Sequence, residues 1–255
     1  MFTRRLLLSS HLDRAYKSEE LLISVIAPML EGLNHVAVGA SSPIPAAAAM
    51  LTRQRTGGRL RVTVLGSQTH HVLTDGGREL FDLAGQGRID AFFLGGGQID
   101  GKGNVNLVGI GEYPQMKVRF PGSFGSAYLY YVVPRVILIR EEHTARVFVE
   151  NVDFISAAGS NEANVHRPGG PYALVTGRCL MGFNKEKKRF TLLSVHAGET
   201  IESVSENTGF KFDCPSEISE TPAPDADSLK ALRGPIAEEL AKTYPVFAER
   251  VFGGI

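Results

Sequence analysis

The densest group of residues that could do chemistry is the stretch GGGQIDGKGNVN, from Gly95 to Asn106. It directly follows the apolar run Ile89–Leu94, which is typical of a buried strand. Glycines lack a Cβ, so backbone N–H groups can approach an anion or a polarised carbonyl oxygen closely. The alternative is a purely structural turn. Ligands of open α/β sheets bind beyond the carboxyl ends of strands, so both interpretations stand at this point.

Three familiar glycine motifs fail on or near this stretch. A P-loop needs Ser or Thr after Lys102, where Gly103 stands. A calcium loop would place Lys102 at a ligand position and Gly111 where the bidentate Glu belongs. The dinucleotide pattern that begins at Gly109 has Pro114 at its last position. Nucleoside triphosphates, calcium and dinucleotides are therefore not predicted ligands.

A second group of candidate residues comprises Ser67, His70 and His71, with Asp75 nearby. A neutral imidazole can take a proton from a hydroxyl near neutral pH, so this group could supply a nucleophile and its base. The alternative is that the two histidines only end a strand. By residue type, the histidines and Asp75 could also bind a metal, although no metal site is predicted.

The elements that position these residues follow from the apolar pattern. Val-rich runs at His35–Gly39 and Leu60–Leu65 predict strands, and Pro43–Arg55 between them predicts a helix. Gly77–Ala84 predicts a second helix before the strand Ile89–Leu94. Further predicted strands are Arg135–Ile139, Arg146–Glu150, Tyr172–Thr176 and Phe190–Val195, with a helix at Glu199–Asn207. The predicted fold is α/β, an open and mostly parallel sheet with crossover helices, and its C-terminal half is richer in β structure.

The two ends of the chain show further helix signals. Ser18 is predicted to cap a helix whose first turn is acidic. The Pro-rich segment 215–227 predicts an extended linker. Behind it, 228–250 predicts a C-terminal helix that is interrupted near Gly234 and Pro235.

Composition limits the class of protein. The 255 residues are predicted to form one domain, 1–255. The 27 Lys and Arg residues balance the 27 Asp and Glu residues, and this lack of excess positive charge argues against nucleic-acid binding.

The sequence shows no signal for export or for membrane insertion. The apolar run Leu6–Leu8 is too short for a secretory signal. The stretch Ala127–Ile139 is interrupted by Pro134 and shorter than the ~20 residues that span a bilayer. We expect a cytoplasmic protein with no membrane contact, whose cysteines, Cys179 and Cys214, are free thiols.

The glycine stretch resembles the GAAQVDxxGNxN loop in the β subunits of family I coenzyme A transferases, of the kind found in glutaconate CoA-transferase. The resemblance extends from about Glu19 to Arg233. It includes PGSFGS (Pro121–Ser126, like PGSGG), RVFVENVDFIS (Arg146–Ser156, like the VFVE-VDF strand), GGPYALVT (Gly169–Thr176, like GGPYRVVT) and LLSVHAGETIESVSENTGF (Leu192–Phe210, like LVSLHPGVTxEDVxxATGF). The order and spacing of these motifs carry the resemblance more than any single motif.

The resemblance implies an open α/β fold, a homologous α subunit, commonly in an α2β2 assembly, and an active site between the subunits. It implies a coenzyme A thioester as substrate and no permanently bound cofactor. The backbone amides of Gly95, Gly96, Gly97 and Gln98 would then polarise the acyl-CoA carbonyl as an oxyanion loop.

Other residues within or near the family-like motifs could have either a structural role or a role in binding. Asn104 and Asn106 are expected to hold the loop by local hydrogen bonds, with substrate contact as the alternative. Ser123 could contact substrate or partner, or serve only its turn. Three further groups are predicted to be structural or solvated, with CoA phosphate binding an alternative for the last: Glu150, Asp153 and the hairpin turn Lys185–Arg189.

One departure from the family pattern affects the chemistry. The family's catalytic glutamate stands in an E-[SN]-G turn, and the resemblance places Leu65, Gly66 and Ser67 there. Leucine cannot form an anhydride, and no Asp or Glu occurs between Leu60 and Thr74. Three hypotheses follow. The first is CoA transfer between an acyl-CoA and a carboxylate. The second is hydrolysis or C–C bond cleavage without a covalent intermediate, as the resemblance to the steroid ring-cleaving branch implies, and the third is a non-catalytic subunit. The acid or base would come from the partner subunit, or locally from Ser67, His70 or His71.

Overall fold

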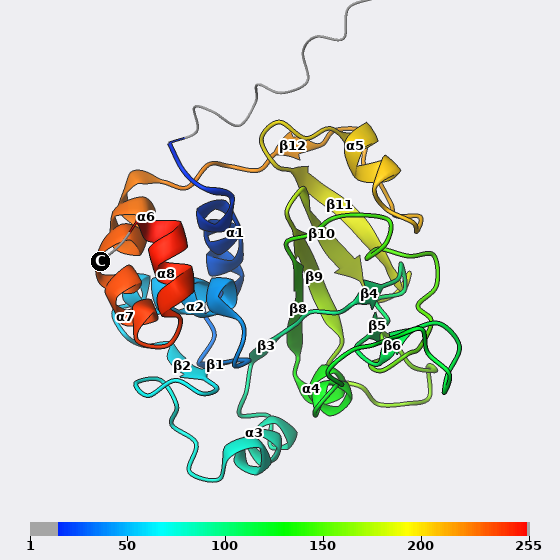
Figure 1. Cartoon of the computed structure of the whole chain (residues 1–255), viewed down its shortest axis with the longest axis horizontal. Helices are drawn as coiled ribbons and strands as arrows, with labels where there is room; N and C mark the ends of the chain where they lie inside the picture. The colour runs from blue at the N-terminus through cyan, green and yellow to red at the C-terminus, as the bar shows by residue number, and fades with distance from the viewer. Residues whose placement is uncertain (1–14, 254–255) are drawn as a thin grey trace, which may run out of the picture.

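The computed structural model describes residues 15–253 and is built around one eight-stranded sheet (Figure 1). Across the sheet the strands run in the order β12-β11-β10-β9-β8-β3-β1-β2. Their bounds are β1 His35–Val38, β2 Arg61–Val64, β3 Ala91–Leu94, β8 Arg135–Arg140, β9 Pro171–Thr176, β10 Cys179–Asn184, β11 Arg189–Val195 and β12 Ser219–Glu220. All neighbours are parallel except β10, which is antiparallel to β9 and β11. The predicted open, mostly parallel α/β sheet is confirmed.

Helices cover both faces of the sheet. Their bounds are α1 Ser18–Ile26, α2 Pro43–Arg55, α3 Gly76–Gly85, α4 Ser126–Val132, α5 Ile201–Glu206, α6 Ala226–Ala231, α7 Ala237–Ala241 and α8 Pro245–Phe252. One core joins the sheet to α1, α2 and the C-terminal helices, and a second lies under α3, α4 and α5. Figure 1 shows α1, α2 and α8 on the side of the sheet opposite the short strands β4, β5 and β6. The central strands are therefore buried on both faces, which explains their continuous apolar sequence.

Short two-residue strands follow the glycine stretch. β4 (Gln98–Ile99) pairs with β5 (Val105–Asn106), and β6 (Gly109–Ile110) pairs with β7 (Val118–Arg119), both antiparallel. They form two small sheets outside the main one. The loop beyond β3 thus has regular structure of its own, which the sequence did not predict.

Two predictions for local structure were wrong. Arg146–Glu150 is a turn rather than a strand: the N–H groups of Val147 and Phe148 both donate to the Thr144 carbonyl, and only a single bridge joins Phe148 to β4. Val147 and Phe148 are buried without belonging to a strand of the main sheet. Ser18 does not cap α1; Lys17 holds that position, and its N–H donates to Glu20 at 2.8 Å.

The C-terminal region is more divided than predicted. Within the expected linker 215–227, Ser219–Glu220 forms the edge strand β12, paired with β11, and α6 begins at Ala226. The segment 228–250 is not one helix: the backbone leaves helical geometry at Gly234, beside the helix-breaking Pro235, and a further break separates α7 from α8. Lys185–Arg189 joins β10 to β11 as the predicted hairpin.

Within residues 15–253, no helix is both long enough and apolar enough to cross a bilayer. The Leu6–Leu8 run lies outside the described residues.

Candidate functional site

A cavity of about 830 Å³ opens at the carboxyl ends of β1, β3 and β8. Leu65, the glycines Gly95–Gly97 and Ser123 all line it. The remaining lining is mostly apolar, contributed by Phe92, Phe93, Leu94, Leu107, Phe120, Pro121, Phe124 and Leu129, with Gly39–Ser42, Gly122, Ser126 and Arg140. The structure therefore brings together residues that were predicted from three separate segments of the chain.

The glycine loop is packed too closely to hold larger residues. A Cβ at Gly96 would lie 2.7 Å from Val105 Cγ1, and a Cβ at Gly97 would lie 2.2 Å from the Phe120 ring. The Gly97 N–H donates to the Asn106 carbonyl at 2.9 Å. Across the described part of the chain, no partner accepts the N–H of Gly95 or Gly96. Those two amides have no protein acceptor, although Gly96 is buried, whereas the amide of Gly97 is used within the loop.

Leu65 reaches the cavity from the residue that follows β2. Its N–H donates to the Val38 carbonyl at 3.0 Å, which fixes its backbone beside β1. The next residue, Gly66, has a left-handed φ of 80°, which turns the chain away from the sheet. Between residues 15 and 253, the cavity lining holds no Asp or Glu, so no described side chain offers a carboxylate to a ligand there.

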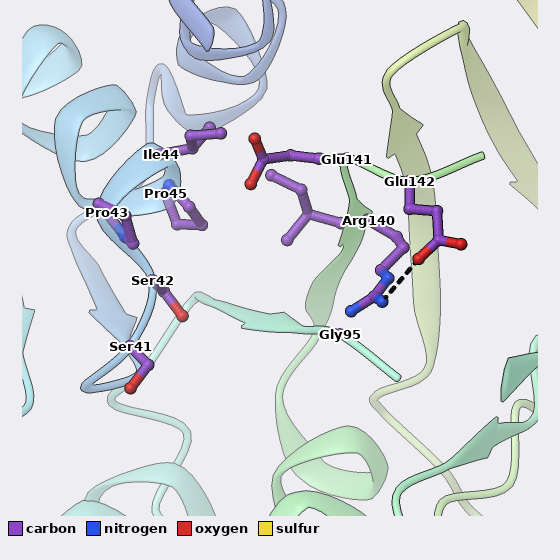
Figure 2. Close-up of a pocket in the computed structure, with 10 residues that line it drawn as sticks. Ser41, Ser42, Pro43, Ile44, Pro45, Gly95, Arg140, Glu141 and Glu142 are labelled. Atoms are coloured by element: carbon purple, nitrogen blue, oxygen red, sulfur yellow. Dashed lines mark hydrogen bonds and ion pairs between the residues drawn. The ribbon is translucent and has the colours of Figure 1, made fainter. Parts of the chain in front are cut away.

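Arg140 is the one charged residue that the described chain contributes to this cavity. It ends β8 and also lines an adjoining cavity of about 490 Å³, with Ser41, Ser42 and Gly95 (Figure 2). Its Nε is buried and has no partner within residues 15–253, and the same holds for the Oγ of Ser126. An unpaired buried donor costs about 1 to 3 kcal/mol. The Nη2 of Arg140 is paired with Glu142 at 3.2 Å, and Glu142 lines the smaller cavity together with Glu141.

Comparison with known proteins identifies the family. The coenzyme A transferase family profile matches residues 34–207. The chain belongs to the coenzyme A transferase family. The glycine loop, Leu65 and Arg140 all lie within the matched part of this coenzyme A transferase fold.

Three relatives illustrate the similarity to the coenzyme A transferase family. The B-type subunit of the 3-oxoadipate CoA-transferase of Pseudomonas knackmussii is 39% identical over 153 residues, which are 58% of each chain. The cholesterol ring-cleaving hydrolase IpdB subunit of Rhodococcus jostii is 28% identical over 160 residues, 61% of this chain and 62% of that protein. The crystal structure of glutaconate coenzyme A-transferase from Acidaminococcus fermentans superposes with a TM-score of 0.75 at 25% identity, covering 86% of this chain and 94% of that one. The sequence matches thus span less than two thirds of the curated relatives.

Two other predicted residues of this coenzyme A transferase chain do not line the cavity. Ser67 Oγ accepts the backbone N–H of His70 at 3.1 Å and the hydroxyl of Thr243 at 2.9 Å. The His70 ring is buried against the C-terminal helices, with Nε2 2.5 Å from Glu239. This turn holds the region after β2 to α7, and neither residue is placed to contact a ligand in the cavity.

The candidate metal ligands are not brought together. His70 pairs with Glu239, and Asp75 pairs with Arg78 on the surface. Among the described residues, no three His, Cys, Asp or Glu side chains are grouped to hold a metal ion.

Side-chain amides of three residues hold the glycine loop in place. Asn106 is fully buried; it donates to Gln98 Oε1 and to the Gly109 carbonyl, each at 2.7 Å. Gln98 Oε1 also accepts the Asp153 N–H. Asn104 donates to Asp100 and accepts the Gly159 N–H. Gln98, Asn104 and Asn106 therefore hold the loop, and none of the three lines the cavity.

The free thiols do not replace the missing nucleophile. Cys179 is buried, and burial raises the pKa of its thiol to about 12. Cys214 is an exposed free thiol away from the cavity. At neutral pH Cys179 is thus protonated and closed to substrate.

Sequence reasoning missed Arg140 and Ser126. Arg140 is a charged residue at the carboxyl end of the apolar run 136–139, next to β3 in the sheet. That position is a recognisable signal once the strand order is known. Ser126 belongs to the motif PGSFGS, but only the structure shows that its hydroxyl lacks a partner among the residues described.

Proposed function

We propose that this chain is the β-type subunit of a heteromeric enzyme that acts on acyl-CoA thioesters and moves CoA from an acyl-CoA to a carboxylate. Its partner would be a homologous α subunit, in an α2β2 assembly. Membership of the coenzyme A transferase family supports this function, and the names of the curated relatives designate them as subunits. The observation that carries the proposal is the loop at Gly95 and Gly96, which lines the large cavity and whose two N–H groups have no acceptor among the described residues.

The proposed chemistry begins at these two amides. The thioester oxygen would accept the N–H groups of Gly95 and Gly96, which withdraw electron density and stabilise the negative charge of a tetrahedral intermediate. Each such donor contributes roughly 3 to 4 kcal/mol to transition-state stabilisation. Gln98 supports the loop through its side chain, and Gly97 through its own hydrogen bond. Ser123, which lines the same cavity, would contact the acyl group or the partner subunit.

A second candidate is favoured by Leu65. Its side chain replaces the carboxylate that would form a covalent intermediate, and one relative is named a ring-cleaving hydrolase subunit. In this case water, activated by a group on the α subunit, would attack the bound substrate.

One experiment separates the two candidates. The chain is copurified with its α subunit and incubated with a panel of acyl-CoA esters, with and without an acceptor carboxylic acid. Thioester loss and the formation of a new acyl-CoA are followed by liquid chromatography. Transfer predicts a new thioester that appears only with the acceptor. Thioester hydrolysis at the same rate without it supports the second candidate, and no turnover of any ester contradicts both.

A further inference from the structure

We propose that the large cavity selects acyl groups that are apolar and carry no terminal carboxylate, so that the enzyme acts on hydrocarbon acyl-CoA esters rather than on dicarboxylic ones. The inference rests on the proposed action on acyl-CoA thioesters and names the substrate class of that same site. It applies to transfer and to hydrolysis alike, because both begin with the thioester bound in this cavity.

The floor of the cavity is continuous with the hydrophobic core. Phe92 and Leu94 of β3 and Leu129 of α4 line the cavity and belong to the core under α3, α4 and α5. None of these three residues is more than 7% exposed. Leu65 and Leu107 also line the cavity and pack against the same core. A ligand on this floor therefore contacts side chains that offer neither a hydrogen-bond donor nor an acceptor.

The apolar lining extends from the glycine loop to the opening of the cavity. Phe120 packs against the loop so closely that a Cβ at Gly97 would lie 2.2 Å from its ring. Phe124 is 78% exposed, and its ring centroid lies 5.4 Å from that of Phe81. The exposed ring of Phe124 offers apolar surface that an acyl chain can remove from water.

The charge at the edge of the cavity is already balanced. Arg140, the one charged residue that the described chain contributes to the lining, is paired with Glu142 at 3.2 Å (Figure 2). A hydrogen bond from Arg146 holds the pKa of Glu142 below its usual value, so this carboxyl is ionised at neutral pH. Glu141 lines the adjoining cavity beside Glu142. A carboxylate brought to Arg140 would therefore lie close to carboxyl groups of the protein.

This arrangement disfavours a second carboxylate on the acyl group. Transfer of an ionised carboxylate from water to an apolar surface without a partner is costly, whereas burial of each methylene group favours binding roughly fourfold. The other polar side chains of the lining are the neutral hydroxyls of Ser41, Ser42, Ser123 and Ser126. Hydroxyls can bond a neutral oxygen of the ligand, but they do not balance a full charge.

The size of the cavity suits an acyl chain of several carbons. Its volume of about 830 Å³ lies within the range of roughly 300 to 1,000 Å³ that is usual for pockets of drug-sized ligands. Gly95 and Gly96, which are proposed to hold the thioester oxygen, belong to its wall. The acyl chain can therefore lie on the apolar floor while the thioester carbonyl stays at the glycine loop.

Two acyl-CoA esters of nearly equal shape test the inference. Glutaryl-CoA ends in a carboxylate, and 5-methylhexanoyl-CoA carries an isopropyl group in its place. Thioester loss is measured with the complex of this chain and its α subunit, with and without acceptor acids. The kcat/KM for 5-methylhexanoyl-CoA should exceed that for glutaryl-CoA about 100-fold or more, because only the carboxylate loses its hydration without a partner. Equal values, or a preference for glutaryl-CoA, would overturn the inference.

A charge placed on the cavity floor should change this preference. Leu107→Arg supplies a cation, so the ratio of the two kcat/KM values should shift toward glutaryl-CoA about 10-fold or more. Leu107→Met keeps the lining apolar and should keep the ratio. Val72→Arg is the control for added charge, since Val72 is exposed and does not line the cavity. An unchanged ratio in assembled Leu107→Arg enzyme would overturn the assignment of this floor to the acyl group.

The outcomes separate this inference from the proposed function. Preferred turnover of glutaryl-CoA overturns the inference alone, because the enzyme would still act on acyl-CoA. Absence of turnover of any acyl-CoA ester contradicts the proposed function. In that case calorimetric titration of the complex with the two esters decides the inference: tighter binding of 5-methylhexanoyl-CoA supports it, and equal or weaker binding overturns it. Should Leu107→Arg not assemble, the ester pair on the unmodified complex decides.

Discussion

Leu65 and Gly95 line the same cavity although they follow two strands that are not neighbours in the sheet. β1 lies between β2 and β3, so the two strand ends are about 10 Å apart, twice the strand spacing. The family resemblance places a nucleophile at the first position and the thioester oxygen at the second. In this chain an apolar side chain therefore faces the site where the thioester is proposed to bind.

Replacing Leu65 by Glu should restore a covalent route. Its backbone is fixed by the hydrogen bond to Val38, and its side chain already borders the cavity. In the assembled enzyme with acyl-CoA, we expect the Leu65→Glu carboxylate to form a CoA thioester, detected by mass spectrometry as up to one adduct per chain. Leu65→Gln is the control, because it has the same length without a nucleophilic carboxylate. If neither variant carries CoA, the assignment of this position is wrong.

Gly96→Ala should reduce kcat about 100-fold, the typical effect of losing one oxyanion donor. The added Cβ would lie 2.7 Å from Val105 Cγ1 and 2.9 Å from the Gln98 carbonyl, so the loop must move. Gly182→Ala serves as the control, since its Cβ would meet only the flexible end of Leu193 at 3.1 Å. Steady-state rates and melting temperatures are measured together. A Gly96→Ala enzyme with unchanged kcat would refute the oxyanion role.

Asn106→Ala should lower the free energy of unfolding by about 2 to 4 kcal/mol, because it removes a hydrogen-bond partner from several buried or half-buried polar groups. These groups are the N–H of Val108 and the N–H and carbonyl of Gly109, whereas Gln98 Oε1 still accepts the Asp153 N–H. Urea unfolding measures the change, and Asn151→Ala on the exposed surface is the control. Equal stability of the two variants would mean that the amide network does not hold the loop.

Acid should destabilise the fold through His143. Burial lowers its pKa to about 4 in the folded chain, against 6.5 for the unperturbed group. Below about pH 6.5 the unfolded chain binds a proton that the folded chain does not bind until about pH 4. The free energy of unfolding should therefore fall across this window, by about 3 kcal/mol in total from this residue.

The variant His143→Gln tests this pH dependence. Gln stays neutral and can still bond Thr176 and Thr208, the partners of the His143 ring. Its stability should fall less than that of the unmodified chain between pH 6.5 and pH 4. His166→Gln, at an exposed position, should keep the original pH profile. Identical profiles for all three proteins would show that His143 is not the group responsible.

Much of the sheet can be predicted from the sequence, because the residues that begin and end each element and the apolar runs within them indicate the same structure. The helix Pro43–Arg55 has both predicted limits, with Pro at its first turn and glycines just beyond its end. The Val-rich runs became β1 and β2 because they are buried on both faces. Since parallel strand ends meet at one edge, the proximity of Leu65 to the glycine loop also follows from the sequence.

Contacts between residues far apart in the sequence determine the features of the fold and the cavity that the sequence did not predict. His70 is turned away from the cavity by Glu239, which lies 169 positions further along the chain. The turn at Arg146–Glu150 has an apolar run, Val147–Val149, that is typical of a strand, but its backbone bonds to Thr144 and to β4. Arg140 belongs to no motif, and only the strand order places it beside Gly95.

The most direct test of the cavity as the thioester site is a crystal structure of the assembled enzyme with an acyl-CoA analogue in which a methylene replaces the sulfur. The measurement is the distance from the analogue's carbonyl oxygen to the amide nitrogens of Gly95 and Gly96. We predict about 2.7 to 3.1 Å to both, with the acyl group in the cavity that Leu65 lines. A carbonyl bound elsewhere, with both amides covered by protein groups, would contradict the account.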